Sequence, residues 1–264
     1  MSASRIGRLA LTGIYRLVLV AVVVYMLAPT VIVTVLSFSA TDFIKFPPAD
    51  WGFRQYSAFF GSTDWVTPML RSLAVAAAAS VLATIAGLGA ILALHRTRTR
   101  GRTAMQVLGI GPLLVPGVAY AIALYSLFSS LHILGGPVAL TLAHATYVLP
   151  FVLLIVGAAI ARVPHDLELA AIGLGASRSR AWWDITLRLL RPAIGASLIF
   201  AFVSSLDEAV IASFLGYNTL PVAIFNSVRY GVDPVITAIA TLLTVGVGAL
   251  LCVYAALRRA EPGR

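Results

Sequence analysis

Six apolar runs, each long enough to cross a lipid bilayer as a helix, constrain the fold of this chain more than any other feature. The runs cover roughly residues 17–38, 73–94, 107–128, 137–160, 193–215 and 235–257. About 20 apolar residues of helix span the hydrocarbon core, where every backbone polar group must find a partner within the protein. The mean hydropathy of +0.96 agrees with this interpretation. We therefore predict an all-α integral membrane protein with six transmembrane helices.

The chain is predicted to form one transmembrane domain over residues 1–264. Its first apolar run is longer than the ~7–15-residue core of a cleaved signal peptide, so we expect it to remain as the first span. The only cysteine, Cys252, lies inside the last apolar run and excludes an internal disulfide.

The distribution of basic residues predicts the orientation of the spans. Of the 19 lysines and arginines, four (Lys45, Arg54, Arg71 and Arg229) fall on one side, which leaves 15 on the other. Basic loops face the cytoplasm, so both termini are predicted to be cytoplasmic. The net charge of +9 therefore reflects membrane topology. It does not indicate nucleic-acid binding, and lipid phosphates are the expected contacts of the basic run at 95–102.

A charged amphipathic segment, residues 163–192, separates the fourth and fifth runs. Asp166 is expected to cap a short helix, Glu168 to complement its dipole, Gly175 to end it and Ser177 to cap a second helix. The first helix would present an apolar face of small and branched residues, namely Leu167, Ala170, Ala171 and Leu174. Two interpretations stay open: a docking surface for a soluble partner, or an ordinary connection that lies in the membrane interface.

The sequence ELAAIGLGASRSRAWWDITLRLLRP, which ends at Pro192, resembles the cytoplasmic EAA loop of ABC-importer permeases. The matching positions include Glu168, Ala170, Ala171, Gly175 and Ala176. The resemblance implies that these residues couple the membrane domain, of the MetI-like permease fold, to an ATPase. The chain departs from the pattern at Leu169, where an acid is usual and would complete a capping box, and at Arg188, where a proline is common.

Two further stretches are similar to the spermidine/putrescine family of permeases. One is W-x-x-x-x-Y-x-x-F from Trp51 to Phe59, and the other contains the Leu-Pro, Val-Arg-x-Gly and Asp-Pro elements between residues 220 and 234. The resemblance implies import of a small amino-containing cation across the bacterial cytoplasmic membrane by alternating access. It also implies three partners: a second permease subunit in a heterodimer, a cytoplasmic ATPase dimer and an extracytoplasmic solute-binding protein. ATP and Mg²⁺ would bind the ATPase, and this chain would bind no cofactor or metal.

Asp207 and Glu208 are adjacent carboxylates inside the fifth run. About 14 residues of helix from Ala193 place Asp207 about 21 Å into the bilayer. Acids at such depth are costly and indicate function. In a continuous helix, Ser204, Asp207 and Ile211 would share a face, so Ser204 and the two acids, with Tyr147 of the fourth span, could line a cation pathway. Alternatively, the acids pair with an arginine or a helix N-terminus in a partner subunit.

The sequence lacks the motifs of an enzyme. It contains no G-x-x-x-x-G-K-[ST] phosphate loop, no H-E-x-x-H and no G-x-S-x-G. We therefore predict a transport subunit that hydrolyses nothing itself. The competing hypothesis is a stand-alone channel or proton-coupled carrier that uses Asp207 and Glu208, although the sequence shows no inverted repeat. An enzyme of lipid metabolism would need a catalytic constellation that is missing.

Overall fold

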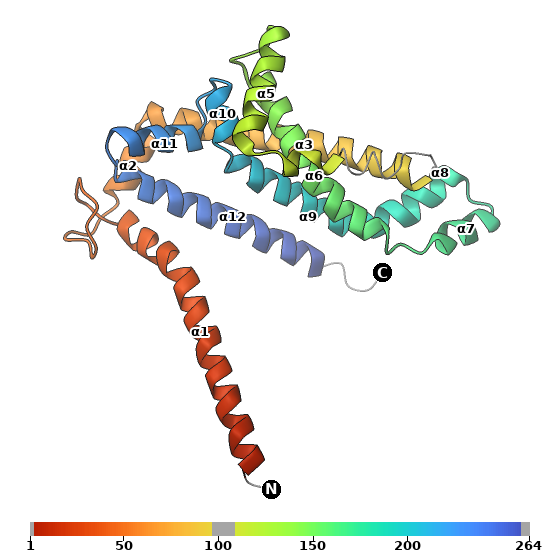
Figure 1. Ribbon diagram of the computed structural model, residues 1–264, viewed down its shortest axis with the longest axis horizontal. Helices are drawn as coiled ribbons and strands as arrows, with labels where there is room; N and C mark the ends of the chain where they lie inside the picture. Colours follow the sequence, from red (N-terminus) through yellow and green to blue (C-terminus); the bar gives the residue numbers. More distant parts are fainter. Residues whose placement is uncertain (1–2, 97–108, 260–264) are drawn as a thin grey trace. The chain divides into compact units, whose positions relative to one another are not determined.

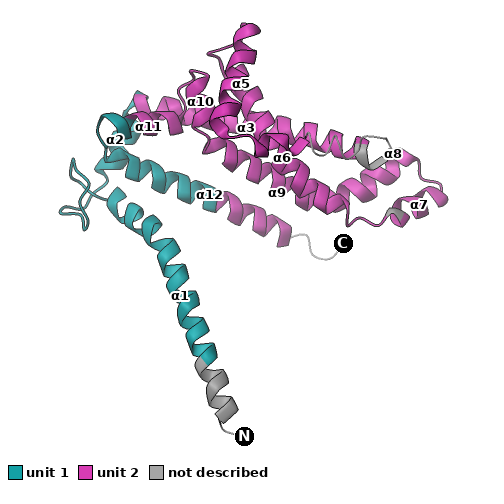
Figure 2. Ribbon diagram, viewed as in Figure 1, with its two compact units in different colours: residues 1–63, 227–248 teal, residues 64–226, 249–264 magenta. Residues whose placement is uncertain are grey.

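The structure is a computed structural model that describes residues 3–96 and 109–259. These residues form helices and no strand, apart from an isolated bridge between Ser39 and Trp51. The chain divides into two compact units, one of residues 1–63 and 227–248 and the other of residues 64–226 and 249–264 (Figure 2). Part of the predicted basic run, residues 97–102, lies outside the described residues.

Five helices in the described part of the chain are long and apolar enough to cross a membrane. They cover Leu11–Ser37, Thr63–Ala93, Pro137–Ile160, Arg178–Leu206 and Val235–Arg259. These spans lie in α1 (Ala3–Ser37), α3 (Thr63–Arg96), α6 (Pro137–Ile160), the stretch ending in α9 (Leu187–Leu206), and α12 (Val235–Arg259). The all-helical membrane architecture is therefore confirmed, whereas six spans and cytoplasmic termini remain predictions.

The third predicted span, at 107–128, is not one continuous helix, and residues 107 and 108 of it lie outside the described residues. A 3₁₀ turn, η1 (Gly111–Leu114), precedes the 14-residue helix α5 (Gly117–Ser130). Between them, Val115 is extended at ψ 130° because a residue that precedes proline avoids the helical region. At about 1.5 Å per residue, α5 is about 21 Å long, shorter than the ~30 Å core.

The core of the larger unit is built from α3, α6 and α9, with α6 and α9 side by side (Figure 1). Its buried residues are Ala79, Ala83, Ile91, Ala145, Val148, Val152, Val156, Ile160, Leu190 and Ala201. Because lipid is as apolar as leucine, close packing of small residues holds such helices together. Gly87 of α3 illustrates this, since a Cβ there would lie 2.8 Å from Cγ1 of Val152.

Two groups of short helices lie at opposite ends of the α6–α9 pair. At one end, α10 (Val210–Phe214) and α5 pack on the start of α6 around Leu140, Ala143 and Ile211. At the other end lie α7 (His165–Gly173) and α8 (Arg178–Ala181) (Figure 1). The 20 residues of α9 span about 30 Å between the two groups. The remaining helix of this region is α11 (Leu220–Tyr230).

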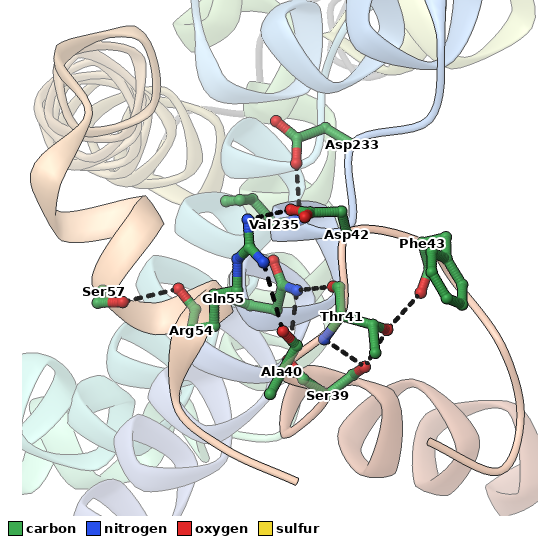
Figure 3. A network of polar contacts seen from close by, with 10 residues as sticks. All are labelled: Ser39, Ala40, Thr41, Asp42, Phe43, Arg54, Gln55, Ser57, Asp233 and Val235. Carbon is green, nitrogen blue, oxygen red and sulfur yellow. Dashed lines mark hydrogen bonds and ion pairs between the residues drawn. The ribbon is translucent and has the colours of Figure 1, made fainter. Parts of the chain in front are cut away.

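In the smaller unit, the loop that follows α1 folds onto α2 (Arg54–Gly61) through polar contacts (Figure 3). Gln55, only 3% exposed, donates to the carbonyl oxygens of Ser39 at 3.3 Å and Thr41 at 2.8 Å. Arg54 forms an ion pair with Asp42. Hydrogen bonds and an ion pair therefore hold the loop against α2.

The aromatic residues of the loop and of α2 differ in their exposure. Trp51 and Phe60 are 64% and 66% exposed. Phe59 is 3% exposed and packs inside, and the hydroxyl of Tyr56 lies 2.7 Å from Oγ of Ser37. Because successive residues of α2 point in different directions, Tyr56 and Phe59 face inward while Phe60 faces outward.

The close approach of α3 and α6 yields a stability prediction. Gly87→Ala should lower the unfolding free energy by about 1–3 kcal/mol, because the side chain of Val152 is stiff at χ1 and cannot move aside. The thermal midpoint of the purified protein should fall accordingly. Gly89→Ala is the matched control: two residues along, exposed, with nothing within 4 Å of a new Cβ. It should be neutral or slightly stabilising. Equal midpoints for the two variants would contradict the packing described.

Candidate functional site

The segment of residues 163–192, called the coupling segment below, begins with α7. The prediction that Asp166 caps this helix is wrong. The helix starts at His165, and Pro164 occupies the cap position without a side-chain hydrogen bond. With φ −65° and ψ 124°, Pro164 has the extended backbone that is typical of a cap residue. Asp166 and Glu168 instead lie in the first turn, where negative charge complements the helix dipole.

The predicted stop at Gly175 is confirmed by its geometry. Gly175 has φ +93°, which residues with a Cβ rarely adopt. Its N–H donates to the carbonyl of Ile172 at 3.0 Å, and the N–H of Ala176 donates to that of Ala171 at 3.0 Å. This pair of hydrogen bonds is the Schellman motif, which ends a helix and turns the chain. Ser177 then caps α8 as predicted, accepting from the N–H of Arg180 at 3.2 Å.

Glu168 links the two halves of the coupling segment. Its carboxylate accepts a hydrogen bond from the hydroxyl of Thr186, which is 1% exposed. Thr186 ends the π-helical turn η2 (Trp182–Thr186), which continues directly into α9. The acid therefore holds α7 against the base of α9 from within the chain.

The outer surface of the coupling segment is unusually apolar for a charged connection. Leu167, Leu169 and Leu174 are 44%, 53% and 90% exposed, and Trp183 is 61% exposed. Ala170 is also exposed, while Ala171 and Ala176 are half-buried. Clustered exposed apolar side chains mark interaction surfaces. The predicted apolar face therefore points outward.

The predicted helix over 193–215 is wrong in its second half. α9 ends at Leu206, and α10 starts only at Val210. The carboxylate of Glu208 accepts the N–H of Val210 at 3.0 Å and that of Ile211 at 2.8 Å. It thereby satisfies backbone donors at the start of α10 that a continuous helix would have bonded internally. The predicted shared face of Ser204, Asp207 and Ile211 is lost with the break.

A buried polar cluster supports Glu208. The Nδ1 atom of His144, on α6, lies 2.8 Å from Oγ of Ser205, and its Nε2 atom lies 3.6 Å from Oε2 of Glu208. The side chains of His144 and Glu208 are 2% and 8% exposed. His144 therefore forms a hydrogen bond between α6 and α9. Its proximity to Glu208 was not predicted, because it depends on the break in the helix.

Asp207 has a different environment from its neighbour. It is exposed, and its carboxylate has no hydrogen-bond or ion-pair partner among residues 3–96 and 109–259. Ser204 is half-buried in the last turn of α9. The ring of Tyr147, on α6, lies against that of Phe151. Of the two predicted pathway acids, only Asp207 is left without a partner in the described residues.

Within the described residues, no group of three or more His, Cys, Asp or Glu side chains is arranged to hold a metal ion.

The chain is similar to known transport proteins over most of its length. Residues 85–261 match the family model described as "Binding-protein-dependent transport system inner membrane component". The putrescine transport system permease protein PotI of Escherichia coli K12 is 32% identical over 234 residues, covering 85% of this chain and 83% of that protein. The spermidine/putrescine transport system permease protein PotC of the same strain is 32% identical over 246 residues, covering 91% and 90%.

A solved structure shows the same fold at low sequence identity. It is a chain of a bacterial alginate ABC transporter, in a crystal structure of its complex with an alginate pentasaccharide-bound periplasmic protein. The TM-score is 0.74 at 14% identity, and the match covers 99% of both chains. The predicted ABC-importer permease fold is therefore confirmed.

The two acids should respond differently to substitution. Glu208→Ala should lower the unfolding free energy by about 2 kcal/mol, because it removes a helix cap and leaves buried donors without an acceptor. Asp207→Ala should change it by less than about 0.5 kcal/mol, as is usual for exposed positions. Thermal midpoints of the two purified variants give the comparison. A larger loss for Asp207→Ala would refute this division of roles.

Proposed function

The chain belongs to the family of binding-protein-dependent transport system inner membrane components, and from this we propose that it imports a small amino-containing cation by alternating access. Within that family it is an ABC-importer permease subunit of the polyamine type, located in the cytoplasmic membrane. It is a transport subunit and not an enzyme, and ATP hydrolysis belongs to a partner ATPase. The family works with a second permease subunit, an ATPase and a solute-binding protein.

One observation carries the proposal: the coupling segment presents apolar side chains outward from a rigidly held elbow. Glu168, Ala170, Ala171, Gly175 and Ala176 lie within that elbow, and its turn depends on the positive φ of Gly175. A partner surface that moves with ATP could push on such an elbow.

Helix α9 is the proposed transmission element. Its base is bonded to α7 through Thr186 and Glu168, and its far end carries Asp207. Movement of the coupling segment would therefore be passed along about 30 Å of helix to the helix break. Alternating access would follow if this movement opens the break to one side of the membrane and then to the other.

The free acid favours a cationic solute. Asp207 offers an exposed carboxylate just after the last turn of α9, which carries the half-buried Ser204. Glu208 is already bonded within the chain and serves as the cap of α10. Two relatives are named for putrescine and spermidine, whose ammonium groups such a site would attract.

A second permease subunit would complete the pathway in a heterodimer. The most apolar stretch of α1 has none of its residues buried inside the chain. An apolar surface of this kind suits contact with a second membrane subunit. The stand-alone carrier hypothesis predicts uptake without ATP, whereas the proposal predicts uptake that needs the ATPase and the solute-binding protein.

The first test separates coupling from backbone strain. In proteoliposomes with the complete transporter, Gly175→Val should reduce ATP-driven putrescine uptake at least about tenfold, while ATP hydrolysis continues. The substitution costs about 1–3 kcal/mol at a positive φ and disrupts the elbow. Gly135→Val is the matched control, because Gly135 has φ +77° and equal space around it but lies between α5 and α6. Equal uptake losses in both variants would count against a coupling role.

The second test addresses the solute. Asp207→Asn should raise the KM for putrescine uptake about tenfold, because one charge–charge contact is removed and the side-chain volume is retained. Asp64→Asn, which alters another exposed acid, in the first turn of α3, is the control. An unchanged KM for Asp207→Asn would exclude this carboxylate from solute binding while leaving the coupling proposal intact.

A further inference from the structure

The larger unit contains an open groove of about 540 Å³ at the end that carries the coupling segment. It is formed where α6 ends, α7 begins, α9 starts and α12 ends. Its walls are mostly apolar and include Leu189, Ala193 and Ala196 of α9. Two arginines, Arg162 and Arg258, also line it, and no acidic side chain does.

Tight contacts between α9 and the end of α12 build one side of the groove. The hydroxyl of Tyr254 donates a hydrogen bond to the carbonyl of Pro192. A Cβ on Gly195 would lie only 2.7 Å from the ring of Tyr254, so the glycine allows the ring to lie directly on α9. The guanidinium of Arg258 lies 6.0 Å from the centre of the same ring. Arg258 is thereby held at the groove.

The charge of the groove is not compensated by any ion pair in the part of the chain that the structure describes. Neither Arg162 nor Arg258 forms an ion pair with any residue in 3–96 or 109–259. Guanidinium groups bind phosphate oxygens through paired N–H donors. Two guanidinium groups beside an apolar groove therefore match a ligand that has a negative phosphate at one end and hydrocarbon at the other.

The position of the groove in the chain identifies the source of such a ligand. Arg162 follows the end of the apolar run in α6, and Arg258 lies in the last turn of α12, so both stand at the edge of membrane spans. The basic-residue distribution assigns this edge to the cytoplasmic side. Anionic phospholipids are enriched there, and basic pockets between helices bind their headgroups.

We propose that this groove binds an anionic phospholipid, with its phosphate between Arg162 and Arg258 and an acyl chain along Ala193 and Ala196. Because the lip of the groove includes Leu167 of α7, the lipid would also contact the coupling segment. The proposal does not depend on which solute is transported.

The test uses the complete transporter in nanodiscs, with a fluorescent label in the groove. Leu189→Cys, 48% exposed, is labelled with bimane in a Cys252→Ser background, and the background without Leu189→Cys corrects for other labelled sites. Brominated phosphatidylglycerol and brominated phosphatidylcholine are then compared as quenchers. Phosphatidylglycerol should quench at a several-fold lower mole fraction, because each arginine at the membrane surface strengthens binding of an anion about fivefold.

Three variants complete the experiment. Arg162→Gln and Arg258→Gln together should abolish the preference for phosphatidylglycerol, whereas Arg259→Gln, the neighbouring arginine outside the groove, should retain it. Equal quenching by the two lipids, or an equal effect of Arg259→Gln, would overturn the proposal. So would displacement of phosphatidylglycerol by millimolar inorganic phosphate, which would reveal a free-anion site, or absence of quenching by either lipid, which would assign the groove to a partner subunit.

Discussion

The contact between the carboxylate of Glu208 and the first N–H groups of α10 is the interaction on which the membrane part of this protein depends. A bilayer offers no water to bond exposed backbone groups, so a helix can break there only where the protein supplies partners. Glu208 supplies two acceptor oxygens at 2.8 and 3.0 Å, and His144, which is bonded to Ser205, lies 3.6 Å from its carboxylate. The break in turn leaves Asp207 exposed beside a bonded neighbour.

This arrangement gives the two adjacent acids different roles, a structural one for Glu208 and an exposed one for Asp207. A buried carboxylate is tolerated when hydrogen bonds compensate its desolvation, and removing its partners is costly. An exposed carboxylate without a partner has no such structural role and is available to a ligand. One acid therefore stabilises the irregular backbone at which the other is presented. The same α9 that ends at this break begins at the coupling segment, so the two candidate sites share one rigid element.

Local signals in the sequence predicted the coupling segment well and the membrane interior less well. The hydrogen bonds at Gly175 and Ser177 join residues that are close in sequence, so their roles as helix stop and cap could be predicted from spacing alone. The break after Leu206 could not be predicted in the same way, because apolar composition continues through it. The residues around it include His144, more than sixty positions earlier in the chain. Likewise, the apolar composition of residues 107–128 predicted a full span and did not reveal that α5 has only 14 residues.

The departure of this chain from the EAA pattern acquires a physical meaning in the structure. The pattern expects an acid at position 169, where this chain has a leucine that is 53% exposed. Successive helical residues point about 100° apart, so moving the acid to Glu168 turns it away from the outer surface. There it bonds Thr186 and braces α7 against α9. The capping box is lost, but an internal brace replaces it, and the outer surface becomes more apolar.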